Sequence, residues 1–570
     1  MRRRFGLWVA PLSNLRPADG IVVLLLLAVL GFGVHLASSA PPTISGPVIR
    51  LNPSALPYYA ALSFLRMLGA YVLSMVFSLV YGYVAARVPG AERLLMPVLD
   101  ILQSVPILSY LPVVLLSLTA VLPVALAVEI SAVLLIFTSQ AWNLTFSFYQ
   151  ALRTEPDELR EATSVFRLGA WLRLSTLELP FATGGLVWNT MMSWAGGWFF
   201  LMAAETFRVG TRDFRLPGLG SYLQTAADQG NVPQILLALA TLVALIVALD
   251  QMVWRPLLVW ADRFKLDTVE GEESAESWFY DLLSRSSLVE FFGRRIWGPA
   301  AERVDTLLAR PRVRPSKPRE VRSAAWAGWV LGAVLMVLLV LGGVQAFRLL
   351  FQLPLSDLRR ILLAALASLL RVGLAIGISA LWTVPVGVAI GSNKRLSDFL
   401  GPIVQVVASI PATALFPVIL LIFLALPGGL NAAAVLLMLL GAQWYVLFNV
   451  IAGASAIPQD LRYTTDILGL SRLERWRTLI LPSLFPYLIT GLITASGGAW
   501  NATIIAEYVQ FAGQTRSTLG LGALIAEATG RGDYALLLGS TLTMVVVVLV
   551  INRFVWRRLY RLAADRYRMD

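Results

Sequence analysis

Apolar stretches long enough to cross a lipid bilayer recur along the whole chain. A hydrocarbon core of about 30 Å needs roughly 20 helical residues, and the sequence contains twelve such stretches, at about 20–38, 59–86, 94–118, 121–148, 180–204 and 232–258 in the first half and at about 325–347, 360–389, 398–424, 430–454, 482–506 and 535–556 in the second. Continuous apolar runs do not fit the alternating strands of a β-barrel. The sequence therefore predicts an all-α integral membrane protein with about twelve transmembrane helices.

Charged residues are sparse and lie mainly beside these stretches. They make up 14% of the 570 residues, against 57% apolar residues, and the formal net charge is +12. Arginines beside membrane spans favour the cytoplasmic side. Because arginines stand before the first span (Arg2, Arg3, Arg4 and Arg16) and at the end of the last (Arg553, Arg557, Arg558 and Arg561), both termini are expected in the cytoplasm. No nucleic-acid motif accompanies the charge.

Two absences narrow the chemistry. The chain has no cysteine, which excludes disulfides and thiolate ligands, and its single histidine, His35, lacks the convergent partners of a metal site. It also lacks GxxxxGK[ST], the loop whose backbone amides and lysine hold nucleotide phosphates. We therefore expect no metal and no cofactor in this chain, and no hydrolysis of ATP by it.

The second half of the chain repeats the first. A shift of 302 residues places Trp142 on Trp444 and superposes many later pairs, among them Pro156 and Pro458, Gly196 and Gly498, Trp198 and Trp500, Glu205 and Glu507, and the runs 218–220 and 520–522. Earlier in each half the shift is 305, which places Arg66 on Arg371. Six spans per half make both halves enter the membrane in the same sense. The sequence thus predicts two parallel permease-like repeats, 1–261 and 325–570, with a path between them.

Residues 262–324 have no counterpart in the repeat. The segment opens with acidic residues, continues with an amphipathic stretch that contains Trp278, Phe279 and Phe291, and ends in a basic, proline-rich run at 310–322. This order fits an interfacial helix followed by a flexible tether. We interpret the segment as a cytoplasmic linker, with binding of anionic lipid as the alternative.

A polar loop separates the fourth and fifth spans of each half. The first loop, residues 156–180, reads PDELREATSVFRLGAWLRLSTLELP, and the second loop, residues 458–482, reads PQDLRYTTDILGLSRLERWRTLILP. Each starts at a proline, continues through a short helix and a glycine turn, and ends at Leu-Pro, where the next span begins. The predicted topology places both loops in the cytoplasm, where a partner can push on them.

The first loop resembles the cytoplasmic loop of bacterial ABC importer permeases. That loop carries Glu-Ala-Ala, a glycine six residues after the glutamate, and then Leu-Pro. Glu161 and Ala162 match the start of the motif, but Arg167 stands in the glycine position and Gly169 follows two residues later. The separation from Glu161 to Pro180 is 19 residues, and the second loop keeps it.

The second loop supplies the part of the motif that the first loop lacks. Gly469 is in the glycine position, whereas Tyr463 and Thr464 replace the Glu-Ala start, and Glu474 follows in the same segment. Each repeat thus carries half of the motif at constant spacing. The resemblance implies that both loops couple to an ATPase.

The resemblance covers nearly the whole chain and is closest to the nitrate, sulfonate, taurine and bicarbonate permeases. Ser-Val-Pro at 104–106, Ser-Ile-Pro at 409–411 and the stretch 500–508 look like that branch. It implies a type I importer-like permease in a bacterial or archaeal inner membrane, two ABC ATPase domains that bind ATP and Mg, an extracytoplasmic solute-binding protein, and a small oxyanion or sulfonate as the solute. Members are usually separate chains that dimerise, so the tandem fusion implies that one chain forms the full path.

Candidate residues of the translocation path occur in equivalent pairs. Arg66 and Arg371 lie within the second span of each half, where they attract an anion or reach back to the outer interface. The third spans contain helix-breaking positions that can free backbone groups for a solute, namely Ser104, Pro106, Ser409 and Pro411. The fifth spans contain paired aromatic and acidic positions, namely Trp198, Trp500, Glu205 and Glu507.

Two other classes of transport protein remain open at this point. A secondary transporter also has twelve spans in two parallel halves, but the chain has few matched intramembrane acids for proton coupling. A passive channel would leave both polar loops without a role. Dependence of uptake on ATP separates the three.

Overall fold

The computed structural model describes residues 17–209, 211–264, 277–286, 291, 295, 298–308, 336–337, 340–511 and 513–566. The first repeat contains, in order, α1 (Pro17–Ala37), η2 (Pro53–Ala55), α2 (Leu56–Arg87), α3 (Ala91–Ser104), α4 (Ile107–Val121), α5 (Val124–Thr154), α6 (Asp157–Val165), α7 (Ala170–Arg173), η3 (Leu174–Glu178), α8 (Leu179–Thr206), β1 (Arg208–Val209), β2 (Arg212–Asp213), α9 (Leu219–Asp228), α10 (Val232–Leu249), η4 (Asp250–Trp254), α11 (Arg255–Ala261) and η5 (Asp262–Phe264).

The second repeat follows the same order after the linker helices α12 (Trp278–Ser284) and α14 (Gly298–Leu308). An apolar helix at Val340–Phe351 precedes α16 (Leu355–Gly391), α17 (Lys394–Ser409), α18 (Ala412–Phe423), α19 (Gly429–Ser455), α20 (Gln459–Ile467), α21 (Arg472–Arg475), η7 (Trp476–Ile480), α22 (Leu481–Glu507), β3 (Tyr508–Phe511), β4 (Gln514–Ser517), α23 (Leu521–Arg531), α24 (Tyr534–Ile551), η8 (Asn552–Trp556) and α25 (Arg557–Arg566).

The duplication extends to irregular helical geometry. The π-helical turns η3 and η7 are 302 residues apart, and so are η4 and η8. π-helical turns are rare in proteins. Their recurrence at a constant shift shows that the two halves share backbone detail as well as residue types.

The number of spans falls short of the predicted twelve. Among the described residues, seven helical segments are long and apolar enough to cross a membrane, and the bent pair α17–α18 makes an eighth. The third span is not one helix in either repeat. It breaks before Pro106 and before Pro411, because the residue ahead of a proline is pushed into extended backbone, and Val105 and Ile410 adopt such angles. The two parts of α17–α18 are bent by 78°.

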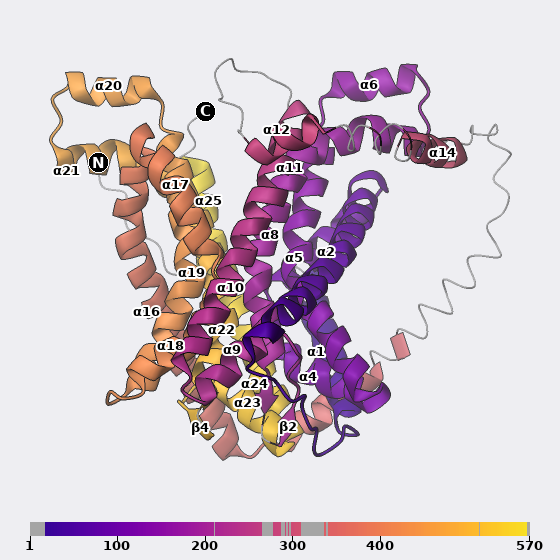
Figure 1. The fold of residues 1–570 in the computed structure, drawn as a ribbon, viewed down its shortest axis with the longest axis vertical. Coiled ribbons are helices and arrows are strands. Elements are labelled where there is room, and N and C mark those ends of the chain that lie inside the picture. Colours follow the sequence, from indigo (N-terminus) through magenta and orange to yellow (C-terminus); the bar gives the residue numbers. More distant parts are fainter. Residues whose placement is uncertain are drawn as a thin grey trace.

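Two short antiparallel hairpins, which the sequence did not predict, interrupt the all-α pattern. β1 pairs with β2 after α8, and β3 pairs with β4 at the equivalent place after α22. Both lie at the end of the bundle opposite α6 and α20 (Figure 1). The fold is therefore all-α in its membrane part, with a hairpin at one end of each repeat.

The two repeats exchange contacts through their broken spans. α4 packs against α22 and α23 of the second repeat, and α18 packs against α8 and α9 of the first. The linker helices lie against the first repeat, α12 on α11 and α14 on α7. The basic run predicted as a tether, 310–322, lies outside the described residues, and the boundaries at 262 and 324 stay a prediction.

Candidate functional site

A cavity of about 860 Å³ lies between the two repeats. The breaks in the third spans form part of its wall through Pro106, Ser409 and Pro411. Trp198 and Trp500, both almost fully buried, line it from α8 and α22. Five of the predicted path residues thus meet at one cavity. Ser104 is the last residue of α3, and its place in the path stays a prediction.

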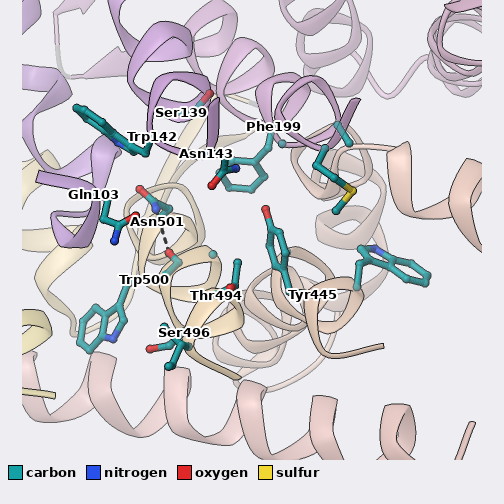
Figure 2. Close-up of a pocket in the computed structure, with 18 of the residues that line it drawn as sticks. Gln103, Ser139, Trp142, Asn143, Phe199, Tyr445, Thr494, Ser496, Trp500 and Asn501 are labelled. Carbon is teal, nitrogen blue, oxygen red and sulfur yellow. Dashed lines mark hydrogen bonds between the residues drawn. The ribbon is translucent and has the colours of Figure 1, made fainter. Parts of the chain in front are cut away.

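The centre of the cavity combines aromatic rings with uncharged polar groups. Figure 2 shows Asn143, Asn501 and Tyr445 directing polar atoms into the space between the helices, with Phe199 close by. The other labelled side chains are Gln103, Ser139, Trp142, Thr494, Ser496 and Trp500, and none carries a formal charge. The centre therefore offers hydrogen bonds and ring faces to a solute.

Asn501 also joins the repeats. Its Oδ1 accepts hydrogen bonds from the backbone N–H of Ile107 at 2.6 Å and of Leu108 at 3.4 Å, the first turn of α4. A side-chain acceptor here satisfies N–H groups that the helix itself leaves free. The equivalent residue of the first repeat is Phe199, which has no such side-chain acceptor, and only its backbone oxygen accepts from the hydroxyl of Thr413 on α18, at 3.2 Å. The two broken spans are thus capped differently.

Charge gathers at one end of the cavity wall. Arg553, Arg557, Arg558 and Arg561, all on η8 and α25, line it, and Asp250 is the acidic lining residue among the described part of the chain. The Asp250 carboxylate is 3.1 Å from Arg255 and is thus paired. This end of the cavity is therefore cationic.

The predicted path residues Arg66 and Glu205 lie away from the cavity, in a buried cluster. The Arg66 guanidinium is 2.9 Å from the Glu205 carboxylate and 2.7 Å from Glu129. Glu205 also accepts hydrogen bonds from the hydroxyl of Ser63 and the backbone N–H of Gly220. The cluster fastens the start of α9 to α2 and α8.

The second repeat builds the same cluster. Arg371 is 2.8 Å from Glu507, which accepts from Ser368 and from the backbone N–H of Gly522, and Asn431 takes the place of Glu129. A Cβ on Gly520 would lie about 2.1 Å from Glu507, so only glycine allows this close approach. Arg66 and Glu205, and likewise Arg371 and Glu507, pair with each other away from the cavity, and their part in the path stays a prediction.

Two short helices stand free of the bundle at one end. α6 in the first loop and α20 in the second project from the same end of the molecule, on opposite sides (Figure 1). Glu161 and Ala162 are exposed on α6, and Tyr463 and Thr464 on α20. Each helix ends in two exposed apolar residues at equivalent positions, Val165–Phe166 and Ile467–Leu468. Neither pair is covered by another part of the described chain.

The turns after the two helices have the same backbone. Gly469 has φ +60°, and Arg167 is the one non-glycine residue of the described chain with a positive φ, +52°. In both turns the next residue, Leu168 or Leu470, donates its N–H to the carbonyl five residues back, a Schellman closure of the helix. Gly169, in contrast, is extended and precedes α7. The residues that the sequence motif aligned therefore occupy the same turn.

Glu474 has a local role in the second loop. Its carboxylate accepts from the backbone N–H of Ser471 at 2.9 Å, and its own backbone N–H donates to the Ser471 hydroxyl at 3.4 Å, which forms a capping box at the start of α21. No equivalent box forms in the first loop, where Gly169 occupies the cap position.

Sequence reasoning did not assign the polar centre of the cavity to the path. Asn143 and Gln103 lie within predicted spans, and a polar residue inside a span was the available signal. Trp142 and Trp444 form a repeated pair in the sequence, but their position at the cavity depends on how the repeats face each other. From sequence alone, the four arginines of the cavity wall predict only the membrane topology.

A duplicated bundle of spanning helices with a cavity between its halves and a paired projecting element defines a solute-translocating membrane protein. Comparison with known proteins makes the class specific. The family model for binding-protein-dependent transport system inner membrane components matches twice, at residues 78–250 and 383–569. The chain belongs to this family, whose members are membrane components of transport systems.

Curated relatives are similar to part of the chain. A nitrate import permease protein from Synechocystis is 30% identical over 189 residues, and a bicarbonate transport system permease protein from Synechococcus elongatus is 30% identical over 190 residues; each match covers 33% of this chain and 65% of the relative. A taurine transport system permease protein from Escherichia coli is 29% identical over 162 residues, which cover 28% of this chain and 55% of that protein.

Proposed function

We propose that this chain is the complete permease of an ATP-driven importer of an anionic solute. The observation that carries the proposal is the duplicated helix and left-handed turn in the first and second loops, each with an exposed apolar pair at its tip. Two equivalent projecting helices can bind in two equivalent grooves on partner domains. We assign these grooves to two ATPase domains, which bind the ATP and Mg that this chain has no motif to hold.

The rest of the proposal follows from the same arrangement. The arginine-lined end of the cavity lies towards the loops, which agrees with the positive-inside bias if the loops and both termini are cytoplasmic. The hairpins then face the outside, where a solute-binding protein delivers the solute. The names of the nitrate, bicarbonate and taurine relatives support an anion as cargo.

Transport in proteoliposomes tests the function. The chain is reconstituted with its ATPase and solute-binding protein, and uptake is expected only when ATP is inside the compartment that the ATPase faces. Uptake driven by an ion gradient alone would favour a secondary transporter, and uptake without either would favour a channel. A catalytically inactive ATPase provides the matched control.

The absence of cysteine from the chain allows a direct test of docking. Single cysteines replace Phe166 and Leu468 at the helix tips, and each is expected to cross-link to a cysteine in the ATPase groove. Cysteine at Thr154, exposed at the end of α5 and outside the loop, is the control that should not cross-link. Equal cross-linking from position 154 would contradict the assignment.

A further inference from the structure

The positive charge along the cavity wall comes from the second repeat. The positions equivalent to Arg558 and Arg561 are Pro256 and Val259 in the first repeat, so only the second repeat supplies these two cations to the wall. Arginines that only set the membrane topology would not need to lie together on one wall of the cavity. This wall attracts the negative group of a solute.

The centre of the cavity has a different chemistry. Tyr445 reaches from α19 towards the first repeat, where its hydroxyl lies 3.6 Å from the position that a Cβ on Gly196 would take. The residue equivalent to Tyr445 is Asn143, which faces the same space (Figure 2). The second repeat thus contributes the Tyr445 ring and the first the smaller amide of Asn143. The smaller side chain leaves room beside the ring. Phe199 adds a second ring from the first repeat.

These two chemistries make different demands on a solute. The faces of aromatic rings carry partial negative charge, so they do not favour a bare inorganic anion, whereas a planar ring is stabilised by each well-placed aromatic neighbour. A cavity of about 860 Å³ is also in the range that holds organic molecules rather than ions of a few atoms.

Resting on the proposed function, we propose that the cargo is an organic anion with a planar, ring-bearing body. The body lies against Tyr445 and Phe199, with Asn143 available for its polar atoms, while the anionic group faces Arg558 and Arg561 of α25. The inference narrows the substrate class from anions in general to aromatic sulfonates or carboxylates.

Protection of a cavity cysteine tests the inference on the full chain in lipid nanodiscs. Ser139, which lines the cavity, is replaced by cysteine, and the rate of alkylation by a maleimide is measured with four solutes that separate ring from charge: benzenesulfonate, methanesulfonate, benzamide and nitrate. Benzenesulfonate is expected to slow alkylation at concentrations at least about tenfold lower than any of the other three. Cysteine at Thr154, outside the cavity, should be unaffected by all four.

Two variants locate the two halves of the effect. Tyr445→Asn is expected to remove most of the preference of the cavity for benzenesulfonate over methanesulfonate. The double variant Arg558→Gln, Arg561→Gln is expected to remove the preference for benzenesulfonate over benzamide. The control Arg395→Gln, exposed at the start of α17 and outside the cavity, should change neither preference. Equal protection by nitrate or methanesulfonate, or no protection by any solute, would overturn the inference. Either result leaves the ATP-dependence and docking tests intact, so the two proposals fail separately.

Discussion

The first and second loops share a backbone but are fastened to the bundle by different chemistry. The first loop ends in a buried ionic network: the Arg87 guanidinium contacts the carboxylates of Glu155 and Glu178, and Arg173 is 2.9 Å from Glu178 and 3.7 Å from Glu155. Both carboxylates are almost completely excluded from solvent. The network ties the end of α2 to both ends of the loop.

The second loop has none of these acids. The positions equivalent to Arg87, Glu155 and Glu178 are Ser392, Ile457 and Ile480. Arg462 instead donates to the backbone carbonyls of Ala454 and Ser392, which closes the C-terminal ends of α19 and α16, and Arg475 pairs with Asp466 in solvent. A helix-end carbonyl is a good partner for arginine, but this fastening buries far less charge. The same fold position can thus be held by ions or by helix ends.

The largest expected effect comes from breaking the ionic network on one side. Glu178→Ile, which installs the residue of the second repeat, leaves two arginines with one buried carboxylate. Removal of one partner from a buried network costs about 3–5 kcal/mol. Thermal unfolding in detergent, followed by the fluorescence of the many tryptophans, should show a clear decrease in Tm.

The triple variant Arg87→Ser, Glu155→Ile and Glu178→Ile sharpens the same comparison. It copies the second repeat at these three positions and removes three of the four charges, which leaves only Arg173, a partly exposed side chain, so it should lose less stability than Glu178→Ile alone. Glu158→Gln, on the exposed face of α6, is the control. If the triple variant has a lower Tm than Glu178→Ile, the ion pairs of the network stabilise the loop by more than the cost of burying their charges.

The turn of the second loop should be the next most sensitive feature. Gly469→Val places a β-branched residue at φ +60°, which costs about 1–2 kcal/mol in backbone strain. Because open space surrounds Gly469, the effect is one of backbone alone. We expect loss of coupling between uptake and solute-stimulated ATP hydrolysis, or loss of the ATPase.

Gly169→Val is the matched control for this change. Gly169 also has open space but is extended, so valine should be accepted there. Wild-type coupling and normal ATPase retention in Gly469→Val would contradict the role of the second loop in power transmission.

A smaller change, towards higher stability, is expected at the equivalent turn of the first loop. Arg167→Gly relieves about 1–2 kcal/mol of left-handed strain against an entropic cost of about 0.5–1 kcal/mol for glycine. The variant should couple normally and be slightly more stable than the wild type. A measured loss of uptake with unchanged stability would mean that the Arg167 side chain itself contacts the ATPase.

The smallest effect is expected in the linker. Deletion of residues 311–318 shortens the predicted tether but retains α14, which packs on α7 of the first loop. Uptake driven by ATP should remain close to the wild-type rate as long as the remaining tether spans the repeats. Loss of uptake in a stably assembled complex would show that the linker regulates the first loop.

Much of the architecture was predictable because hydrophobic length and internal repetition are local properties of a sequence. The paired loops, the breaks at Pro106 and Pro411, and the alignment of Arg167 with Gly469 follow from residue spacing. The hairpins were missed because strands of two to four residues leave too short a pattern. Fewer than twelve spans are found among the described residues, where the third span of each half is two short helices and the predicted span at 325–347 is only partly described.

The role of the charged residues within spans could not be obtained from sequence. Arg66 and Arg371 look alike whether they face a solute or an acid, and only packing brings Glu205 and Glu507 within 3 Å of them. The same holds for the ionic network under the first loop, whose members come from α2, the end of α5, α7 and η3.

The sequence by itself determined a duplicated membrane bundle and its two projecting loops, since apolar length, proline breaks and constant spacing act locally. Tertiary structure decided which face of each helix meets the other repeat. It placed Tyr445 opposite Asn143, aligned the arginines of α25 along one wall, and closed Arg66 into a cluster. The physical reason is that charge and ring chemistry depend on neighbours from distant parts of the chain, and those neighbours meet only when the two halves pack.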